Sequence, residues 1–366
     1  RPMMHLPASG DGGRIGVPYP ARAVTIAALI LDDGPTLLLA SSPAQAQAIF
    51  EELQLMPALR MQGAVRMERT AIAGTGASFP SSYLPPPDQP SLFAVNRSFL
   101  PVSASAGLLY DLPYGMVARV TAQHVERAPD PVELFYKGPH DTPRTFEIGD
   151  PTMTLEKADT LEIGLKRGRG DTRFEISAHY TRFGNFIYKN FTGLMCNDSF
   201  ATCGAPGASF DQIIYSQRDA TFMGGEFQLE HDEARLWDGI WGVEAQYDIV
   251  RATFADGGYV PKIPPYRLGG GLFYRDPSWS ARINLLHAFA QNNLGAFETP
   301  TPGYNLLNAE LSYMAKLPNP TFPTELTIGL RGENLLNDSI RFHQSYKKDE
   351  VLQPGRNIRL FASVKF

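Results

Sequence analysis

The sequence predicts an all-β protein, an antiparallel transmembrane β-barrel, and three observations lead to this fold class. Strand-like segments recur along the chain, the gaps between them alternate between short and long, and most segments have one apolar and one polar face. The composition agrees, because charged residues make up 19% and aromatic residues 11% of the chain, with 33 glycines and 30 prolines. Low charge with many turn-forming residues fits a series of strands better than a helical protein.

The predicted strands alternate with gaps of two kinds. Period-two alternation and β-forming residues predict strands at 46–56, 58–70, 98–111, 114–126, 157–168, 171–186, 211–230, 239–254, 265–275, 279–290, 303–315, 324–336 and 357–366. The first gap and every second gap after it are short, and the others are long: 71–97, 127–156, 187–210, 255–264, 291–302 and 337–356. Outer-membrane barrels alternate short periplasmic turns with long extracellular loops in this way.

The faces of the strands support a membrane location. The last predicted strand has an apolar face and a polar face, with Phe361 as the exception on the polar face. Aromatic residues gather at strand ends, and Trp237 and Trp279 lie beside short turns, where a periplasmic interface is expected. The sequence contains no apolar run of about 18 residues, so it predicts no transmembrane helix.

The chain divides into two predicted parts, residues 1–45 and a barrel segment over residues 46–366. The first part does not follow the short–long rhythm, although residues 24–31 and 36–40 on either side of an Asp-Asp-Gly-Pro turn predict a hairpin.

Cys196 and Cys203 lie in a polar, glycine-containing stretch without further Cys or His at ligand spacing. A loop disulfide in an oxidising compartment is the favoured interpretation, and two free thiols are the alternative. The net charge of −5 excludes a general nucleic-acid binder, which would need a basic face.

Several motifs occur in a fixed order. Arg127-Ala128-Pro129 precedes Glu133-Leu134-Phe135, Asp150-Pro151 precedes Leu155-Glu156, and Gly332 to Asn337 reads Gly-Glu-Asn-Leu-Leu-Asn before a last strand ending in Phe366. These resemble the R-A-P-x-x-x-E-L-F/Y, G-N-P-x-L-x-x-E and G-x-N-L-L-N motifs of TonB-dependent receptors. Asp150 stands where the family usually has Asn.

The resemblance implies a receptor barrel of about 22 strands, of which about 13 or 14 are expected here without the plug domain. It further implies that the protein is located in the bacterial outer membrane. The partners it implies are outer-membrane lipid, the barrel-assembly machinery, which would recognise Phe366, and the TonB complex, which would act through the plug domain. The isolated chain is not expected to transport. No resident cofactor is implied.

Within this family, the sequence most resembles the zinc-uptake receptors. The resemblance lies in Gly138-Pro139-His140-Asp141 and in the segment around His287. The expected cargo is therefore a metal ion or metal chelate, zinc or an iron chelate. His140, Asp141, His287 and His343 are candidate substrate-binding residues, and His140 is a candidate metal ligand, since imidazole and carboxylate suit zinc. The alternative for each is an ordinary loop, girdle or lumen residue.

Other residues are expected to be structural. His124 and His179 lie within strands and are expected to face the lumen. Arg127 is expected to brace its loop by pairing with Glu133, Glu147 or Glu156, and Asn334 and Asn337 to end the penultimate strand with side chain–backbone hydrogen bonds.

No G-x-S-x-G, H-E-x-x-H or P-loop pattern is present, which indicates that the protein is not an enzyme. The alternative function is a plug-less, porin-like or adhesive barrel.

Overall fold

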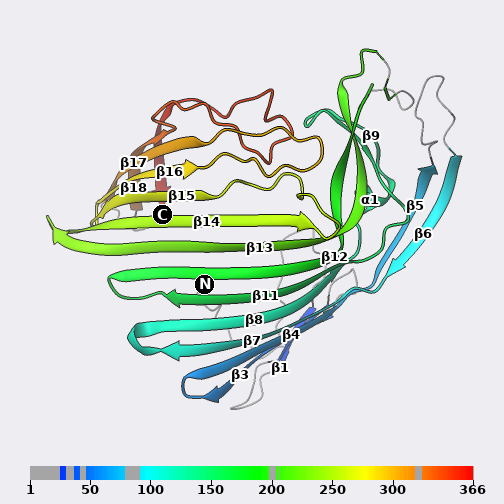
Figure 1. The fold of residues 1–366 in the computed structure, drawn as a ribbon. Helices are drawn as coiled ribbons and strands as arrows, with labels where there is room; N and C mark the ends of the chain where they lie inside the picture. The colour runs from blue at the N-terminus through cyan, green and yellow to red at the C-terminus, as the bar shows by residue number, and fades with distance from the viewer. Residues whose placement is uncertain are drawn as a thin grey trace.

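The computed structural model describes residues 25–29, 37–41, 47–78, 91–197, 203–204, 206–317 and 324–365. Its main feature is a curved antiparallel wall in which successive strands lie side by side (Figure 1). The strands of this wall, in order of pairing, are β1 (Thr25–Leu29), β2 (Leu37–Ser41), β3 (Gln47–Met56), β4 (Leu59–Met67), β7 (Val102–Leu112), β8 (Met116–Arg127), β11 (Glu156–Arg167), β12 (Thr172–Cys196), β13 (Phe210–Leu236), β14 (Gly239–Phe254), β15 (Arg267–Arg275), β16 (Trp279–Ala288), β17 (Tyr304–Leu317), β18 (Thr324–Glu333) and β19 (Asn357–Lys365).

The antiparallel barrel-type sheet predicted from the sequence is confirmed, and every strand predicted from residue 46 onward has a counterpart in the wall. Within the described residues, β1 pairs only with β2 and β19 only with β18, so the wall is open between them. An unpaired strand edge is costly in lipid, and these two edges are where the wall can gain pairing partners.

Two of the predicted long loops contain structure that sequence analysis missed. In the predicted loop 71–97, the described residues belong to β5 (Thr70–Ser78) and β6 (Ser91–Phe99), which pair with each other as a separate hairpin. Residues 127–156 contain the helix α1 (Pro131–Phe135) and the strands β9 (Lys137–His140) and β10 (Thr145–Ile148), while a 3₁₀ turn at Pro113–Gly115 joins β7 to β8. In the described part of the chain, no helix has the length and apolarity needed to span a membrane.

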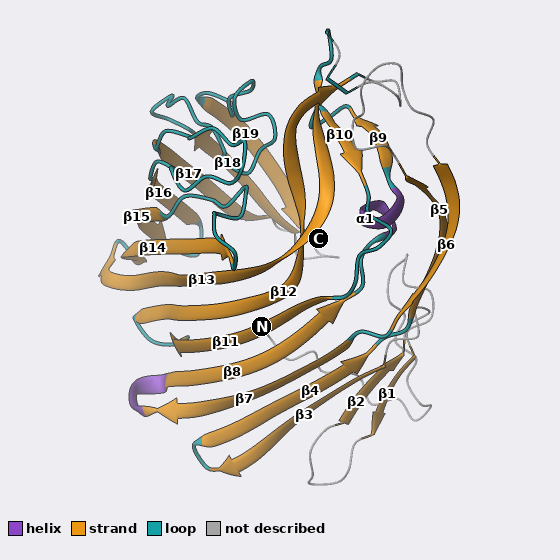
Figure 2. Cartoon of the chain, turned by 45° about the vertical axis from the view of Figure 1, so that its right-hand side comes forward, coloured by secondary structure: helices purple, strands orange, loops and turns teal. Residues whose placement is uncertain are grey.

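The strands β12 and β13 extend far past the wall. They contain 25 and 27 residues, whereas crossing a bilayer takes about 9–11 residues of a tilted strand. Figure 2 shows β9, β10 and α1 beside the upper part of this long hairpin, and β10 pairs in parallel with Asp211 to Ile214 of β13. Residues 187–196, the first part of the predicted loop 187–210, therefore continue strand β12, and β10 supplies further pairing partners to this extended hairpin outside the bilayer.

The two faces of the wall differ in chemistry. Large apolar side chains such as Ile163, Leu272 and Leu360 point outward and are 56%, 53% and 74% exposed. The inner face holds cross-strand ion pairs, for example Arg173 with Glu230 (2.6 Å) and Arg331 with Glu310 (2.6 Å). An apolar outer band around a polar interior is the pattern of a transmembrane barrel.

Phe361, the exception in the last strand, lies on the inner face for a packing reason. A Cβ on Gly329 of the neighbouring strand would overlap the Phe361 ring, so the ring lies over the glycine. The Arg331 guanidinium lies 5.8 Å from the same ring centroid. Phe273 lies in the same way over Gly242. The inner face thus accepts an aromatic ring where a neighbouring glycine leaves room for it.

Aromatic side chains mark the end of the wall with the short turns. Trp237 is 75% exposed and packs edge-on against Trp241 at 6.1 Å between centroids, and Trp279 packs against Tyr313 at 4.8 Å. Amphipathic rings at this height suit a membrane–water interface.

The assignment of the faces can be tested with Leu272→Arg at the middle of β15. An arginine on the lipid-facing surface at this depth is expected to lower the free energy of unfolding by about 2–4 kcal/mol in phospholipid vesicles, measured by urea titration. The matched control is Gln228→Arg, because the side chain at position 228 points into the lumen beside Glu175. This variant is expected to change the free energy of unfolding much less than Leu272→Arg does. Equal losses in the two variants would show that the faces are assigned wrongly.

Candidate functional site

The long loops fold inward over the upper part of the inner face. Val260 packs against Ala252 and Phe254 of β14, and Ile340 packs against Ala288 and Tyr304. These contacts bury apolar side chains that the strands present near their extracellular ends. The loops 255–266 and 337–356 are thereby held above the lumen, next to the β12–β13 hairpin.

A cluster of two lysines and two aromatic rings lies where these loops meet the hairpin. The ring of Tyr346 has the Lys189 ammonium 5.3 Å and the Lys262 ammonium 5.0 Å from its centroid. Lys262 also lies 5.5 Å from the Phe191 ring, and the two rings are 5.9 Å apart. A cation is attracted to the face of an aromatic ring, so these contacts orient both ammonium groups. We call Lys189, Phe191, Lys262 and Tyr346 the lysine–aromatic cluster.

Glu147 holds the first lysine. Its carboxylate is 2% exposed and accepts hydrogen bonds from Lys189 Nζ (2.7 Å), Tyr215 OH (2.8 Å) and Thr145 Oγ1 (2.9 Å). Burial acts to raise the pKa of Glu147, but the three hydrogen bonds outweigh it, so the pKa lies below its ordinary value. Burial and the hydrogen bond to Glu147 raise the pKa of Tyr215.

Glu298 holds the second lysine. Its side chain is 1% exposed, lies 3.6 Å from Lys262 Nζ and 3.5 Å from His343 Nε2, and accepts the backbone N–H groups of Lys262 and Gly295. Burial acts to raise the pKa of Glu298, and the neighbouring His343 together with the hydrogen bonds from the backbone lowers it overall. The Lys262 pKa is lowered by burial.

Burial also affects the ring between the lysines. It raises the pKa of Tyr346 to about 12, so the phenol stays protonated at neutral pH. Two lysines, two buried carboxylates and one neutral phenol therefore form a single connected network across the extracellular opening.

The structure brings two of the predicted substrate-binding residues to this network. His140 Nδ1 lies 3.2 Å from Glu147 Oε1, with the histidine half exposed, and Asp141 follows it on the surface. His343 is fully buried between Glu298 and Thr301, whose Oγ1 lies 3.0 Å from Nδ1, and so it supports the loop from within.

His287 lies elsewhere. It shares the outer face of β16 with Leu285, and its Nδ1 is 2.9 Å from Asn305 Oδ1. Across the described residues, no group of three or more His, Cys, Asp or Glu side chains could hold a metal ion.

The prediction that His124 faces the lumen is wrong. The strand registers place it on the outer face with Val120 and Leu161, and its Nδ1 lies 2.7 Å from Asp159 Oδ1. A polar residue in an alternating strand was expected inside, but both partners of this ion pair lie at the outer rim of the wall. His179 does face the lumen, where its ring covers Gly224.

Arg127 braces the loop before α1. It donates to Glu133 (2.8 Å) and Glu156 (3.1 Å), whereas Glu147 belongs to the lysine network. Glu133 also accepts the backbone N–H of Asp130, which completes a capping box on α1. One arginine therefore ties the helix to the top of the wall.

The turn after β18 depends on two asparagines with positive φ, Asn334 (48°) and Asn337 (56°). The Asn334 side chain donates to the carbonyls of Asp338 and Pro354, and Asn337 Oδ1 accepts the N–H of Arg356. The Phe366 prediction lies outside the described residues.

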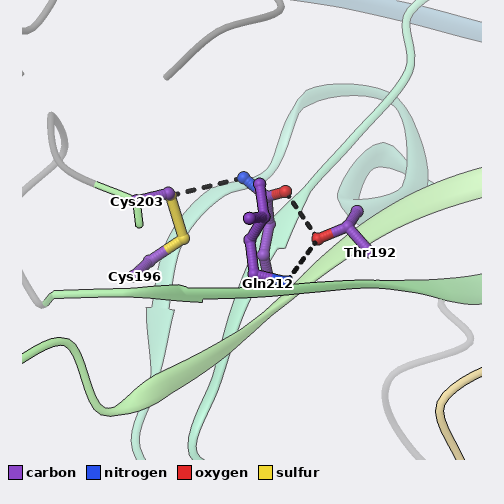
Figure 3. Close-up of a disulfide and its surroundings, with 5 residues drawn as sticks. Thr192, Cys196, Cys203 and Gln212 are labelled. Atoms are coloured by element: carbon purple, nitrogen blue, oxygen red, sulfur yellow. Dashed lines mark hydrogen bonds between the residues drawn. A yellow bond between two sulfur atoms is a disulfide. The ribbon is translucent and has the colours of Figure 1, made fainter. Parts of the chain in front are cut away.

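Cys196 and Cys203 form a disulfide at the tip of the β12–β13 hairpin (Figure 3). Gln212 donates a hydrogen bond to Cys203 Sγ at 3.3 Å and accepts one from Thr192 Oγ1 at 2.7 Å. The disulfide is therefore linked through Gln212 of β13 to Thr192 of β12.

Sequence reasoning missed the lysine–aromatic cluster and Glu298. The available signal was weak: lysines within two residues of aromatic residues, as in Tyr188-Lys189-Asn190-Phe191, in loops that were expected to be irregular.

Comparisons with known proteins agree with the fold. Residues 41–335 match the family described as TonB dependent receptor-like, beta-barrel. The copper transporter OprC is 17% identical with a TM-score of 0.66, covering 93% of this chain and 56% of that protein. The ferric-catecholate import receptor Fiu from K12 E. coli is 17% identical (TM-score 0.56; 94% and 49% covered), and the ferric citrate transporter FecA is 15% identical (TM-score 0.57; 90% and 46% covered). The chain thus spans about half the length of these structures.

The Glu147 network is expected to depend on pH. Because its folded pKa lies below the ordinary 4.5, the stabilisation is fully present above 4.5 and is lost as the pH falls through the folded value. We expect amide hydrogen exchange in residues 140–148, corrected for intrinsic rates, to accelerate in that acidic range. Glu147→Gln should raise it about tenfold already at pH 7.

Glu350→Gln is the matched control, because it removes only the exposed partner of Arg144 and should leave the exchange nearly unchanged. An acid response that persists in Glu147→Gln would contradict this account.

Proposed function

Because the chain belongs to the family of TonB-dependent receptor β-barrels, we propose that it forms the barrel wall of a bacterial outer-membrane receptor that takes up a metal chelate. This family comprises transporters and not enzymes. The proposed partners are outer-membrane lipid, the barrel-assembly machinery and, through a plug domain, the TonB complex.

The observation that carries the cargo proposal is the lysine–aromatic cluster. It lies on the lumen side of the extracellular end, where an incoming solute arrives first. Ammonium groups bind carboxylate or catecholate oxygens, and aromatic rings stack on planar chelator groups. Lys189 and Lys262 keep 26% and 17% of their side-chain surface exposed, so both can be reached from the opening.

The two carboxylates explain how the site can stay folded without cargo. Glu147 and Glu298 neutralise the lysines, since partly buried charges without partners would be costly. An anionic chelate would take over the exposed side of each ammonium group and leave the buried carboxylates in place.

The similar structures described above are those of a ferric-catecholate import receptor, a ferric citrate transporter and a copper transporter. They support a chelated metal as cargo for this chain. Zinc as a bare ion would need several imidazole or carboxylate ligands around one point. Among the described residues, the one hydrogen-bond partner of the His140 imidazole is Glu147, and that carboxylate already accepts hydrogen bonds from Lys189, Tyr215 and Thr145. We therefore propose zinc as a cargo only when a chelator holds it, and not as a free ion.

The test is chelate binding and uptake by cells that express the whole protein, with radiolabelled ferric citrate and a ferric tris-catecholate as probes. Lys189→Ala and Lys262→Ala are expected to weaken binding of an accepted chelate about tenfold each. Lys316→Ala, an exposed lysine at the opposite end of the wall, should bind as the unchanged protein does.

Three outcomes would overturn the proposal. They are saturable uptake of free zinc ions in preference to both chelates, equal affinity in all three variants, and non-saturable flux that persists without TonB. The last outcome would favour the porin-like alternative.

A further inference from the structure

The outer face carries a groove of about 870 Å³ over β3, β4, β7, β8, β11 and β12. Strand registers explain its shape. One row across the wall contains the small residues Gly63, Ala106 and Ala122, whereas the row nearer the periplasm has Met61, Leu108 and Val120 at the corresponding places. The groove is therefore a notch in the apolar belt, formed where three neighbouring strands lack large side chains.

The row on the extracellular side of this notch is charged. It runs from Ala104 through His124 and Asp159 to Arg182, each directly paired across the strands with the next. His124 and Asp159 form an ion pair at 2.7 Å. Arg182 is exposed, and among the described residues it has no hydrogen-bond or ion-pair partner.

The location of the groove determines its occupant. Its floor continues directly into the exposed apolar belt around Leu108, Leu161 and Ile163, which lipid chains cover in a membrane. Its charged row lies at the extracellular margin of this belt, the height of outer-leaflet headgroups. A guanidinium with all its donors available is well suited to bind a phosphate through two parallel hydrogen bonds.

We propose that this groove is a specific site for a phosphate-bearing lipid of the outer leaflet. Arg182 binds the phosphate, an acyl chain fills the notch over Gly63, Ala106 and Ala122, and the His124–Asp159 pair receives hydroxyl or amine groups of the headgroup. The site rests on the membrane placement proposed above and is independent of the cargo.

The experiment is native mass spectrometry of the whole protein in detergent, with phosphatidylglycerol, lipopolysaccharide and diacylglycerol offered separately. Retention of either phosphate-bearing lipid, with diacylglycerol lost, is the expected result, and the two lipids distinguish the sources of the phosphate. Arg182→Ala, and separately Ala106→Leu with Ala122→Leu, should each weaken retention about tenfold.

Two control variants lie on the same face outside the groove. Arg251→Ala removes another exposed outer-face arginine, and Ala281→Leu adds the same bulk on β16; both should retain lipid as the unchanged protein does. Heat-dependent mobility on gels shows whether each variant is folded. Arg182→Lys is a conservative second variant, and we expect it to retain an intermediate amount of lipid.

The proposal is overturned if diacylglycerol is retained as well as the phosphate-bearing lipids. It is also overturned if Arg182→Ala, or the variant with Ala106→Leu and Ala122→Leu, retains these lipids as the unchanged protein does, or if Arg251→Ala loses as much lipid as Arg182→Ala. A protein dimer that fills the groove and excludes both lipids would overturn it as well. Chelate uptake is measured in parallel, because failure of lipid retention with intact uptake rejects this site alone.

Discussion

The pairing of backbone N–H and C=O groups between neighbouring strands is the constraint on which the rest of this structure depends. In a bilayer no water can satisfy these groups, so each strand must pair along its whole crossing. Pairing fixes the register, and the register fixes the face on which every side chain lies. A shift of one residue in β8 would move Arg119 and Thr121 into the lipid and Val120 into the lumen, so the ion pair of Arg119 with Glu162 and the apolar belt depend on the same register.

Side chains on the inner face then adapt to one another within that register. Phe273 and Phe361 occupy an otherwise polar surface because Gly242 and Gly329 leave room for their rings, and arginines lie beside both rings. Above the bilayer the constraint is relaxed, since water can satisfy the backbone. There β10 adds a parallel partner to β13, and the loops are held by apolar contacts such as Ile340 against Ala288.

The difference between the strands inside the bilayer and the segments above it explains which features could be predicted from the sequence. The strand predicted at 239–254 matches β14 residue for residue, because alternation and short turns are local signals that the bilayer enforces. The ends of β12 and β13 could not be predicted, since their extension depends on pairing with β10, a segment distant in sequence. His124 was misplaced because polarity alone does not separate the lumen from the outer rim, where ion pairs also occur.

The candidate site was hardest to predict for the same reason. Glu147, Lys189, Lys262 and Tyr346 come from four separate segments, and none has a spacing that marks it. His140 and His343 were singled out for their imidazole chemistry, and the structure places both on carboxylates that also contact a lysine. The histidines are therefore peripheral to a network whose centre is cationic and aromatic.

The two faces of the wall also differ in how available their cations are. Inside, Lys189 and Lys262 are each held by a carboxylate that is almost fully buried, so an arriving anion gains only the exposed side of each ammonium group. Such a site favours a ligand that reaches both lysines at once, because one weak contact would not offset the ordering of the loops. Outside, Arg182 has no hydrogen-bond or ion-pair partner among the residues that the structure describes, so the proposed lipid phosphate can use its full set of donors. The proposed chelate, with several donor groups, therefore suits the lumen side, and the proposed lipid headgroup, with one phosphate, suits the outer rim, because buried carboxylates hold the lysines but not Arg182.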